Sequence, residues 1–197
     1  MSEQLDKANE NLENEQQGAA SKRDKLFKEL YEWLECGVMA LILVVLIFTF
    51  IGRTSFVSGS SMTNTLVDGD MLFVSRWGFN AEPGDIVVAT KPYSHNEPII
   101  KRIIATGGQT VDINFEEGIV FVNGEMIDED YVRTPTNRNY GMEFPLTVPE
   151  GYVFLLGDNR NGSYDSRASE IGLVDERYVM GKAYFRVYPF SSFKPLY

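Results

Sequence analysis

Residues 118–124 read Gly-Ile-Val-Phe-Val-Asn-Gly, a short β-branched and aromatic run that ends in an Asn-Gly pair. Asn-Gly is a strong signal for a two-residue hairpin, because both central positions of that turn need a positive φ. Similar runs, separated by Gly, Pro, Asn or Asp, occupy residues 70–76, 85–89, 99–105, 111–113, 152–156 and 182–188. Short strands at this spacing, without a long segment of helical period, predict a mainly β domain, an antiparallel barrel or sandwich.

An uncharged apolar run lies upstream of these strands. Residues 36–51 read CGVMALILVVLIFTFI. As a helix they span roughly 24 Å, and Trp33, Leu34 and Arg53 extend the run toward the ~30 Å of a bilayer core. We expect one N-terminal transmembrane helix at residues 36–53. A cleaved signal peptide fits less well, because bulky residues follow the run where cleavage needs small ones.

Basic residues around this run predict its orientation. Four precede it closely, at positions 22, 23, 25 and 28, whereas only Arg53 and Arg76 occur in a comparable stretch after it. The positive-inside rule therefore predicts a single-pass protein of the cell membrane with its N-terminus in the cytoplasm. The expected order is a disordered cytoplasmic tail (1–21), a juxtamembrane helix (22–35), the anchor (36–53) and an extracytoplasmic domain (54–197) with a hairpin and loop insertion at 112–148.

Composition excludes several classes of function. The 197 residues carry a formal net charge of −10, which argues against a nucleic-acid partner. Aromatic residues make up 13% of the chain and favour a packed domain. Cys36 is the only cysteine, so no intrachain disulfide forms, and His95 is the only histidine. No metal-ligand cluster and no phosphate-binding loop are present, so we expect neither a metal nor a cofactor.

Three segments combine residue types that carry chemistry. They are Ser58–Leu66, Ile99–Ile104 with a lysine and an arginine in an apolar strand, and Gly157–Arg167, dense in Gly, Asn, Asp, Ser and Arg. Each has an ordinary explanation by itself: a linker, a solvated strand-edge lysine and a surface loop. The third could equally form a buried hydrogen-bonded network beside a reacting group.

Taken together and in this order, the three segments resemble bacterial type I signal peptidase (leader peptidase), a Ser–Lys serine protease, in its Gram-positive-like form. The resemblance covers about residues 36–197. The matching motifs are Ser61-Met62 with Thr65-Leu66, Pro83-Gly84-Asp85-Ile86-Val87, Lys101-Arg102, Gly157-Asp158-Asn159-Arg160, Ser163-x-Asp165-Ser166-Arg167 and Gly181-Lys182-Ala183.

The resemblance implies roles that the chemistry supports. Ser61 would be the nucleophile, and Lys101 the general base that activates it. Only a neutral amine is a base, so burial must lower the lysine pKa by roughly two to three units from ~10.4. Ser163 would hydrogen-bond the amine and orient it. Asp165 would pair with Arg167 and so stay away from the amine.

Departures from the family pattern concern the oxyanion hole and the turn after the nucleophile. Asn64 replaces the usual proline, which loosens the turn. Gly59 stands where many members have a serine that donates to the oxyanion, and losing one such donor costs roughly 10²–10³ in rate. The main-chain N–H of Ser61 and a neighbouring amide would remain. Expected oxyanion or supporting residues also include Ser60, Arg102 and Asp158.

The expected substrates are exported preproteins, cleaved at small-x-small sites after the signal peptide. An extended segment would pair with strands beside the nucleophile. Apolar walls for its small side chains are expected from Phe56, Val57, Leu72 and Ile100.

The main alternative is a non-catalytic, membrane-tethered relative that assists assembly of pili or surface proteins. It would be expected to lack Ser61 or Lys101, and both are present. A self-cleaving repressor-type protease also uses a Ser–Lys pair, but it carries a DNA-binding domain in place of an anchor. A signal peptidase with a histidine base would need His95, which does not occupy the matching position.

Overall fold

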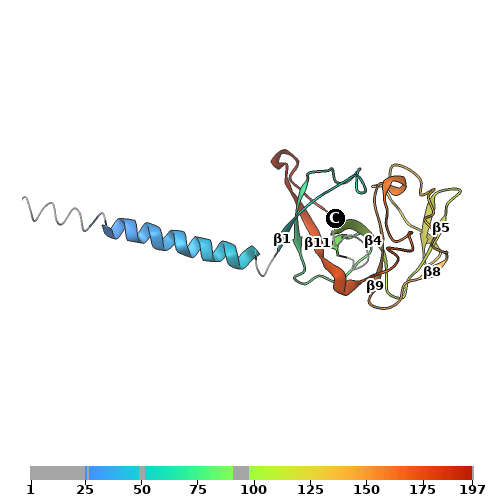
Figure 1. Ribbon diagram of the computed structural model, residues 1–197, viewed down its shortest axis with the longest axis horizontal. Helices are drawn as coiled ribbons and strands as arrows, with labels where there is room; N and C mark the ends of the chain where they lie inside the picture. Colours follow the sequence, from blue (N-terminus) through green and yellow to red (C-terminus); the bar gives the residue numbers. More distant parts are fainter. Residues whose placement is uncertain (1–24, 26, 49–51, 91–97, 197) are drawn as a thin grey trace, which may run out of the picture. The chain divides into compact units, whose positions relative to one another are not determined.

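The computed structural model describes residues 25, 27–48, 52–90 and 98–196 and divides into two units, Met1–Phe48 and Thr49–Tyr197. In the first unit, residues 27–46 are helical and residues 47–48 form a π turn (Figure 1). Within the described parts, no helix has both the length and the apolar content for a membrane crossing. The expected tail at 1–21 lies outside the described residues, and the anchor stays a prediction.

The second unit contains a large antiparallel sheet. Its order is β1 (Arg53–Phe56), β2 (Met71–Ser75), β11 (Val179–Tyr188), β3 (Ile86–Ala89), β4 (Ile99–Thr106), β9 (Tyr152–Leu156) and β10 (Val174–Asp175), with β12 (Lys194–Pro195) on β11. Every strand pair is antiparallel, so the predicted antiparallel β fold is confirmed. The order is an open path, which leaves β1 and β10 at its two ends.

A smaller sheet lies between β4 and β9 in the chain. Its order is β7 (Glu125–Met126), β6 (Ile119–Val122), β5 (Thr110–Asn114) and β8 (Leu146–Thr147), so the segment expected as a hairpin and loop holds four strands (Figure 1). The predicted hairpin turn is confirmed. Asn123 and Gly124 have φ of 54° and 82°, and Val122 pairs with Glu125 across them.

The central strands are buried on both faces, which explains their continuous apolar sequences. On β9, Val153 and Leu155 face one core cluster, whereas Phe154 and Leu156 face another. The cluster of Phe154 and Leu156 also contains buried residues of β5 and β6, so it joins the two sheets. Short 3₁₀ helices complete the unit: η2 (Arg160–Gly162), η3 (Glu176–Tyr178) and η4 (Phe190–Ser192).

A third cluster supports the segment between β1 and β2. It contains Val57, Met62, Leu66, Leu72, Val74, Ile86, Val88, Ile100, Ala183 and Leu196. Because its members come from β2, β3, β4 and β11, this cluster fixes the β1–β2 connection against the strand that carries Lys101. The sequence analysis did not predict β1, since this strand follows the apolar run without a turn signal.

Candidate active site

Ser61 lies in the connection of residues 57–70 between β1 and β2, here called the serine loop. Met62 and Leu66 are 1% and 0% exposed and insert into the core cluster below the loop. The Leu66 N–H donates to the Met62 carbonyl at 2.9 Å, which fixes the spacing of these two anchors. Ser61 itself stays partly exposed, which its expected role as nucleophile requires.

Lys101 of β4 reaches the serine. Its Nζ lies 2.7 Å from Ser61 Oγ and 3.2 Å from the carbonyl oxygen of Ile100. The residue is only 4% exposed. Burial lowers the pKa of Lys101 from 10.5 to about 8, although the nearby charges of Asp165 and Asp158 act to raise it. This drop agrees with what a lysine needs to act as a base near neutral pH.

The segment after β9 holds the serine loop through side chains and main chain. Asn159 donates its main-chain N–H to the Ser61 carbonyl and its side-chain amide to the Ser60 carbonyl, both at 3.0 Å. In return, the Asn64 amide donates to the Asp158 carbonyl at 3.2 Å. Three hydrogen bonds thus tie the serine loop to the segment after β9, almost a hundred positions away in the chain. The sequence analysis gave Asn159 no role of its own, although it stands inside the third motif.

Arg102 and Asp158 form a buried bidentate ion pair. Arg102 Nε and Nη2 donate to the two carboxylate oxygens at 2.9 and 2.7 Å. Nη1 donates to the Gly84 carbonyl at 2.7 Å, and the guanidinium lies 3.9 Å from the centroid of the Tyr131 ring. Asp158 also accepts a hydrogen bond from the Thr65 hydroxyl of the serine loop. The pair therefore connects β4 to the serine loop directly.

Asp165 and Arg167 form a second buried pair, as the resemblance implies. Arg167 Nε and Nη2 donate to Asp165 at 2.8 and 2.9 Å, and neither side chain is exposed. The carboxylate also accepts the Gly157 N–H at 3.0 Å. The Asp165 charge still raises the pKa of Lys101, but by less than burial lowers it.

Arg160 has partners that the sequence did not indicate. Its guanidinium forms an ion pair with Glu129, with one N–H···O distance of 2.8 Å, and donates to the Thr136 hydroxyl at 2.9 Å. Arg160 is fully buried. Glu129 is 31 positions away and belongs to no motif, so only the fold brings it here.

Ser163 departs from its expected geometry. Its hydroxyl is buried and has no hydrogen-bond partner among the described residues, so the expected bond to the Lys101 amine is not formed. The hydroxyl nevertheless lies beside the site. A Cβ added to Gly157 would come within 2.2 Å of Ser163 Oγ and 2.5 Å of the Ser61 carbonyl oxygen. Glycine at position 157 is what allows the serine loop and Ser163 to approach each other.

The amides near the nucleophile differ in availability. Gly59 has a φ of +85° and donates its N–H to the Asp68 carboxylate at 2.8 Å, so that amide is occupied. The N–H of Ser61 has no hydrogen-bond acceptor among the described residues. Of these two donors, only the Ser61 amide is free for an oxyanion.

Of the four residues expected to line the substrate pockets, three are buried and one is exposed. Val57, Leu72 and Ile100 are 5%, 0% and 8% exposed and belong to the core cluster below the serine loop. Leu72 therefore offers no surface of its own, contrary to its expected role. Phe56 is 66% exposed at the end of β1.

The described residues contain no group of three or more His, Cys, Asp or Glu side chains arranged to hold a metal ion. What the site does contain is a partly exposed hydroxyl held against a buried amine of lowered pKa. This geometry is the one that a serine hydrolase with a lysine base in place of a histidine would need.

Comparison with known proteins gives the family. The family model described as "Signal peptidase, peptidase S26" matches residues 30–188. The probable signal peptidase I-2 of Synechocystis sp. is 38% identical over 168 residues, 80% of this chain and 74% of the relative. Signal peptidase I of Bacillus licheniformis is 33% identical over 175 residues, 84% of this chain and 92% of the relative.

A solved structure of signal peptidase I from Enterococcus faecalis is 32% identical and covers 53% of this chain and 97% of that one, with a TM-score of 0.44. The family match and the two relatives span most of the chain. The chain belongs to the signal peptidase family, peptidase S26, and is a serine endopeptidase.

Proposed function

We propose that this protein removes N-terminal signal peptides from exported preproteins at small-x-small sites, as a signal peptidase I. The observation that carries the proposal is the 2.7 Å approach of Lys101 Nζ to Ser61 Oγ, with the lysine only 4% exposed. Similarity to proteins named signal peptidase I over most of the chain supports the substrate class.

The geometry supports a two-step acyl transfer. Neutral Lys101 takes the proton as Ser61 Oγ attacks the scissile carbonyl carbon, and the ammonium then protonates the departing amine of the mature protein. This leaves the signal peptide as an ester on Ser61. A water molecule then loses a proton to the same amine as it attacks the ester. The ammonium returns that proton to Ser61 Oγ as the ester bond breaks, and the signal peptide leaves with a new carboxyl group. With a pKa of about 8, about one tenth of Lys101 is neutral at pH 7.

The developing oxyanion needs hydrogen-bond donors, and we assign that role to the Ser61 N–H. Gly59 contributes conformation, since its positive φ suits glycine. We assign Ser163 the role of orienting the amine once a substrate occupies the site. Its buried hydroxyl has no hydrogen-bond partner among the described residues, and it approaches Gly157 from the same side as the Ser61 carbonyl.

Two open strand edges support binding of an extended peptide. β1 is the terminal strand of the large sheet. β4 pairs with β9 only from Arg102 onward, and no other described strand pairs with the β9 side of Ile99–Lys101. A preprotein segment pairing here would place its backbone beside the lysine and its small side chains toward Phe56, Val57 and Ile100.

Membrane attachment is the remaining part of the proposal. The apolar run at residues 36–51 would anchor the chain in the lipid bilayer, with the N-terminus in the cytoplasm and residues 54–197 outside. Large apolar side chains on the described helical residues support it, because Leu41, Leu43 and Phe48 are 63%, 59% and 50% exposed. Side chains of this kind need a nonaqueous environment or a partner.

The test is cleavage of a preprotein with an Ala-x-Ala site by the detergent-solubilised full chain. Ser61→Ala and Lys101→Ala should each abolish cleavage with the fold intact by circular dichroism. Ser169→Ala and Lys194→Ala remove the same groups from exposed positions and should cleave normally. If the folded wild type cleaves none of several preproteins between pH 7 and 10, the peptidase proposal is wrong and the assembly role takes its place.

A further inference from the structure

Residues 127–137, between β7 and β8, form no strand or helix and belong to none of the motifs. Two side chains of this 127–137 loop nevertheless reach buried arginines near the Ser–Lys pair. Glu129 forms an ion pair with Arg160, and the Tyr131 ring lies against the Arg102 guanidinium. The Tyr131 hydroxyl also donates to the Glu129 carboxylate at 3.1 Å. The loop therefore contacts two arginines through two side chains that are bonded to each other.

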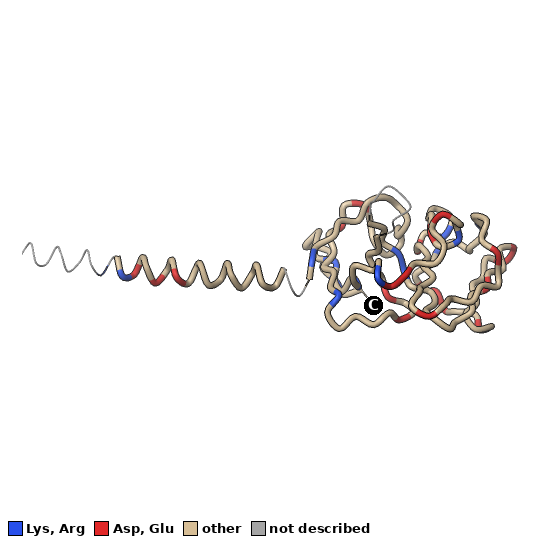
Figure 2. The backbone as a smooth tube through the Cα atoms, turned by 60° about the horizontal axis from the view of Figure 1, so that its bottom comes forward, with Lys and Arg blue, Asp and Glu red and all other residues tan. Residues whose placement is uncertain are grey.

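Glu129 differs from its acidic neighbours in burial. Acidic positions are spread over the second unit, so a carboxylate near an arginine is not informative by itself (Figure 2). The Glu129 side chain, however, is only 12% exposed, and each of its oxygens accepts a hydrogen bond from Arg160. Asp128 and Asp130 on either side of it are exposed. Because burial of a carboxylate is costly without a partner, the pair with Arg160 is what allows Glu129 to point inward.

Arg160 links this ion pair to the nucleophile. Its Nε donates to the Gly157 carbonyl at 3.3 Å, and its own carbonyl accepts from Arg167 at 2.6 Å. Gly157 packs so closely on the serine loop that an added Cβ would lie 2.5 Å from the Ser61 carbonyl oxygen. A shift of Arg160 would therefore move Gly157 against the main chain of Ser61, because protein interiors are close-packed.

Tyr131 is linked to the serine loop through Arg102. A guanidinium can stack on an aromatic ring with its face while it donates hydrogen bonds in its plane. Arg102 does both, since its guanidinium lies 3.9 Å from the Tyr131 centroid and its Nε and Nη2 donate to Asp158. Asp158 accepts a further hydrogen bond from Thr65 of the serine loop. Tyr131 thus fixes the plane in which Arg102 holds Asp158.

We propose that Glu129 and Tyr131 are positioning residues for the peptidase reaction, which keep the serine loop in place against Lys101. The inference deepens the proposed function and rests on it. Both residues act through an arginine, and neither is bonded to the reacting hydroxyl or amine. The 2.7 Å contact between Ser61 Oγ and Lys101 Nζ depends on such placement, since a misplacement of about 1 Å can cost about 100-fold in rate.

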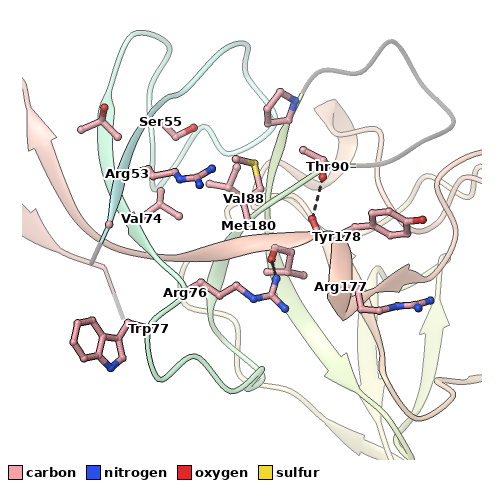
Figure 3. A pocket seen from close by; sticks show the side chains of 14 residues that line it. Arg53, Ser55, Val74, Arg76, Trp77, Val88, Thr90, Arg177, Tyr178 and Met180 are labelled. Carbon is pink, nitrogen blue, oxygen red and sulfur yellow. Dashed lines mark hydrogen bonds between the residues drawn. The ribbon is translucent and has the colours of Figure 1, made fainter. Parts of the chain in front are cut away.

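Loss of either contact should affect turnover and leave peptide affinity unchanged. A cavity of about 470 Å³ opens beside the start of β1, an edge at which the proposed peptide would pair (Figure 3). Its described lining comes from β1, β2, β3, β11 and adjoining residues, and none of it from the 127–137 loop. We therefore expect changes in this loop to lower kcat at constant KM.

The experiment measures kcat and KM of the detergent-solubilised full chain on the Ala-x-Ala preprotein, together with the urea midpoint of unfolding. Tyr131→Leu should lower kcat by about tenfold at constant KM, because the orientation of the Ser–Lys pair is relaxed. Tyr131→Phe keeps the ring on Arg102 and should restore most of the kcat. Glu129→Gln keeps the size of the side chain, loses the ion pair with Arg160 and should also lower kcat by about tenfold.

Two variants of the same loop are matched controls. Asp128→Asn removes a carboxylate from the exposed position next to Glu129 and should change neither kcat nor the urea midpoint. Ile127→Ala removes apolar contact with the core cluster that joins the two sheets. It should lower the urea midpoint and leave kcat unchanged, because it contacts neither arginine through a hydrogen bond or an ion pair.

A wild-type kcat in Tyr131→Leu would overturn the proposal and make Tyr131 a residue that only stabilises the fold. An equal loss of kcat in Ile127→Ala would also overturn it, since activity would then follow stability. If Glu129→Gln does not fold, the two Tyr131 variants decide, because neither leaves a buried charge unpaired. Failure of the proposed function is distinguishable: the wild type would then cleave no preprotein, whereas failure of this inference leaves the wild type active.

Discussion

Two adjacent residues of β4, Lys101 and Arg102, are equally buried but differ in whether a carboxylate pairs with them. Arg102 has a bidentate carboxylate, a main-chain carbonyl and an aromatic face as partners. Lys101 has a hydroxyl and a carbonyl, and its pKa falls to about 8. The buried arginines Arg102, Arg160 and Arg167, here called the frame arginines, each form an ion pair with a carboxylate. Lys101 has no such pair among the described residues, and burial lowers its pKa.

The largest expected effect on activity comes from removing the amine of Lys101. Lys101→Met keeps the stem and removes the amine, so cleavage should fall by about 10²–10⁴-fold, the scale of general base catalysis. The same variant should unfold at a higher urea concentration, because it no longer buries an amine with few partners. If Lys101→Met lost both activity and stability, the buried amine would not be a cost to folding as we infer.

Removing the carboxylate that pairs with Arg102 should mainly lower stability, in contrast to the loss of the Lys101 amine. Asp158→Ala leaves the Arg102 guanidinium buried and unpaired, which should lower the free energy of unfolding by about 3–5 kcal/mol. Urea denaturation checks this. The control is Arg177→Ala, whose side chain is 84% exposed and whose loss should not measurably change stability. If both variants lowered the free energy of unfolding equally, the buried ion pair would be no more important for stability than the exposed one.

The pH profile tests the charge balance around the amine. Activity requires neutral Lys101, so kcat/KM should rise with pH through a midpoint near 8. The Asp165 charge raises the lysine pKa, so Asp165→Asn should move this midpoint to lower pH, and the unpaired Arg167 should act in the same direction. Asp112→Asn, at an exposed strand position, should leave it in place. A midpoint at higher pH in Asp165→Asn would show that the Asp165 charge does not raise the pKa of Lys101.

The smallest effect is expected at Ser163. Its hydroxyl has no partner among the described residues, so Ser163→Ala should leave the urea midpoint unchanged or slightly raised. If Ser163 orients the amine in the substrate complex, kcat should fall with little change in KM. Unchanged kcat would make it a packing residue that fits against Gly157.

Local chemistry explains what the sequence predicted correctly. The Asn123-Gly124 turn and the five longer strands of the large sheet, β2, β3, β4, β9 and β11, follow from patterns within a few residues. The Asp165–Arg167 pair was expected because its members are two positions apart in a recognisable motif. Family resemblance, not periodicity, supplied the roles of Ser61 and Lys101.

The errors have physical causes too. β1 was not predicted because it follows the apolar run without a break, and β10 and β12 are too short for a periodic signal. Leu72 was expected to line a pocket, yet strand alternation placed it fully in the core. Ser163 was expected to meet the amine, but a hydrogen bond depends on a side-chain rotamer that a sequence does not specify.

The sequence by itself determined the β class, the family and the residue types available for catalysis, because these depend on local patterns and on motifs in a fixed order. Only the tertiary structure decided which charges are compensated. Glu129 meets Arg160, Tyr131 stacks on Arg102, and Lys101 meets a hydroxyl 40 positions away. A pKa depends on the solvent and charges within a few ångströms, and those neighbours are brought together by the fold and not by the order of residues.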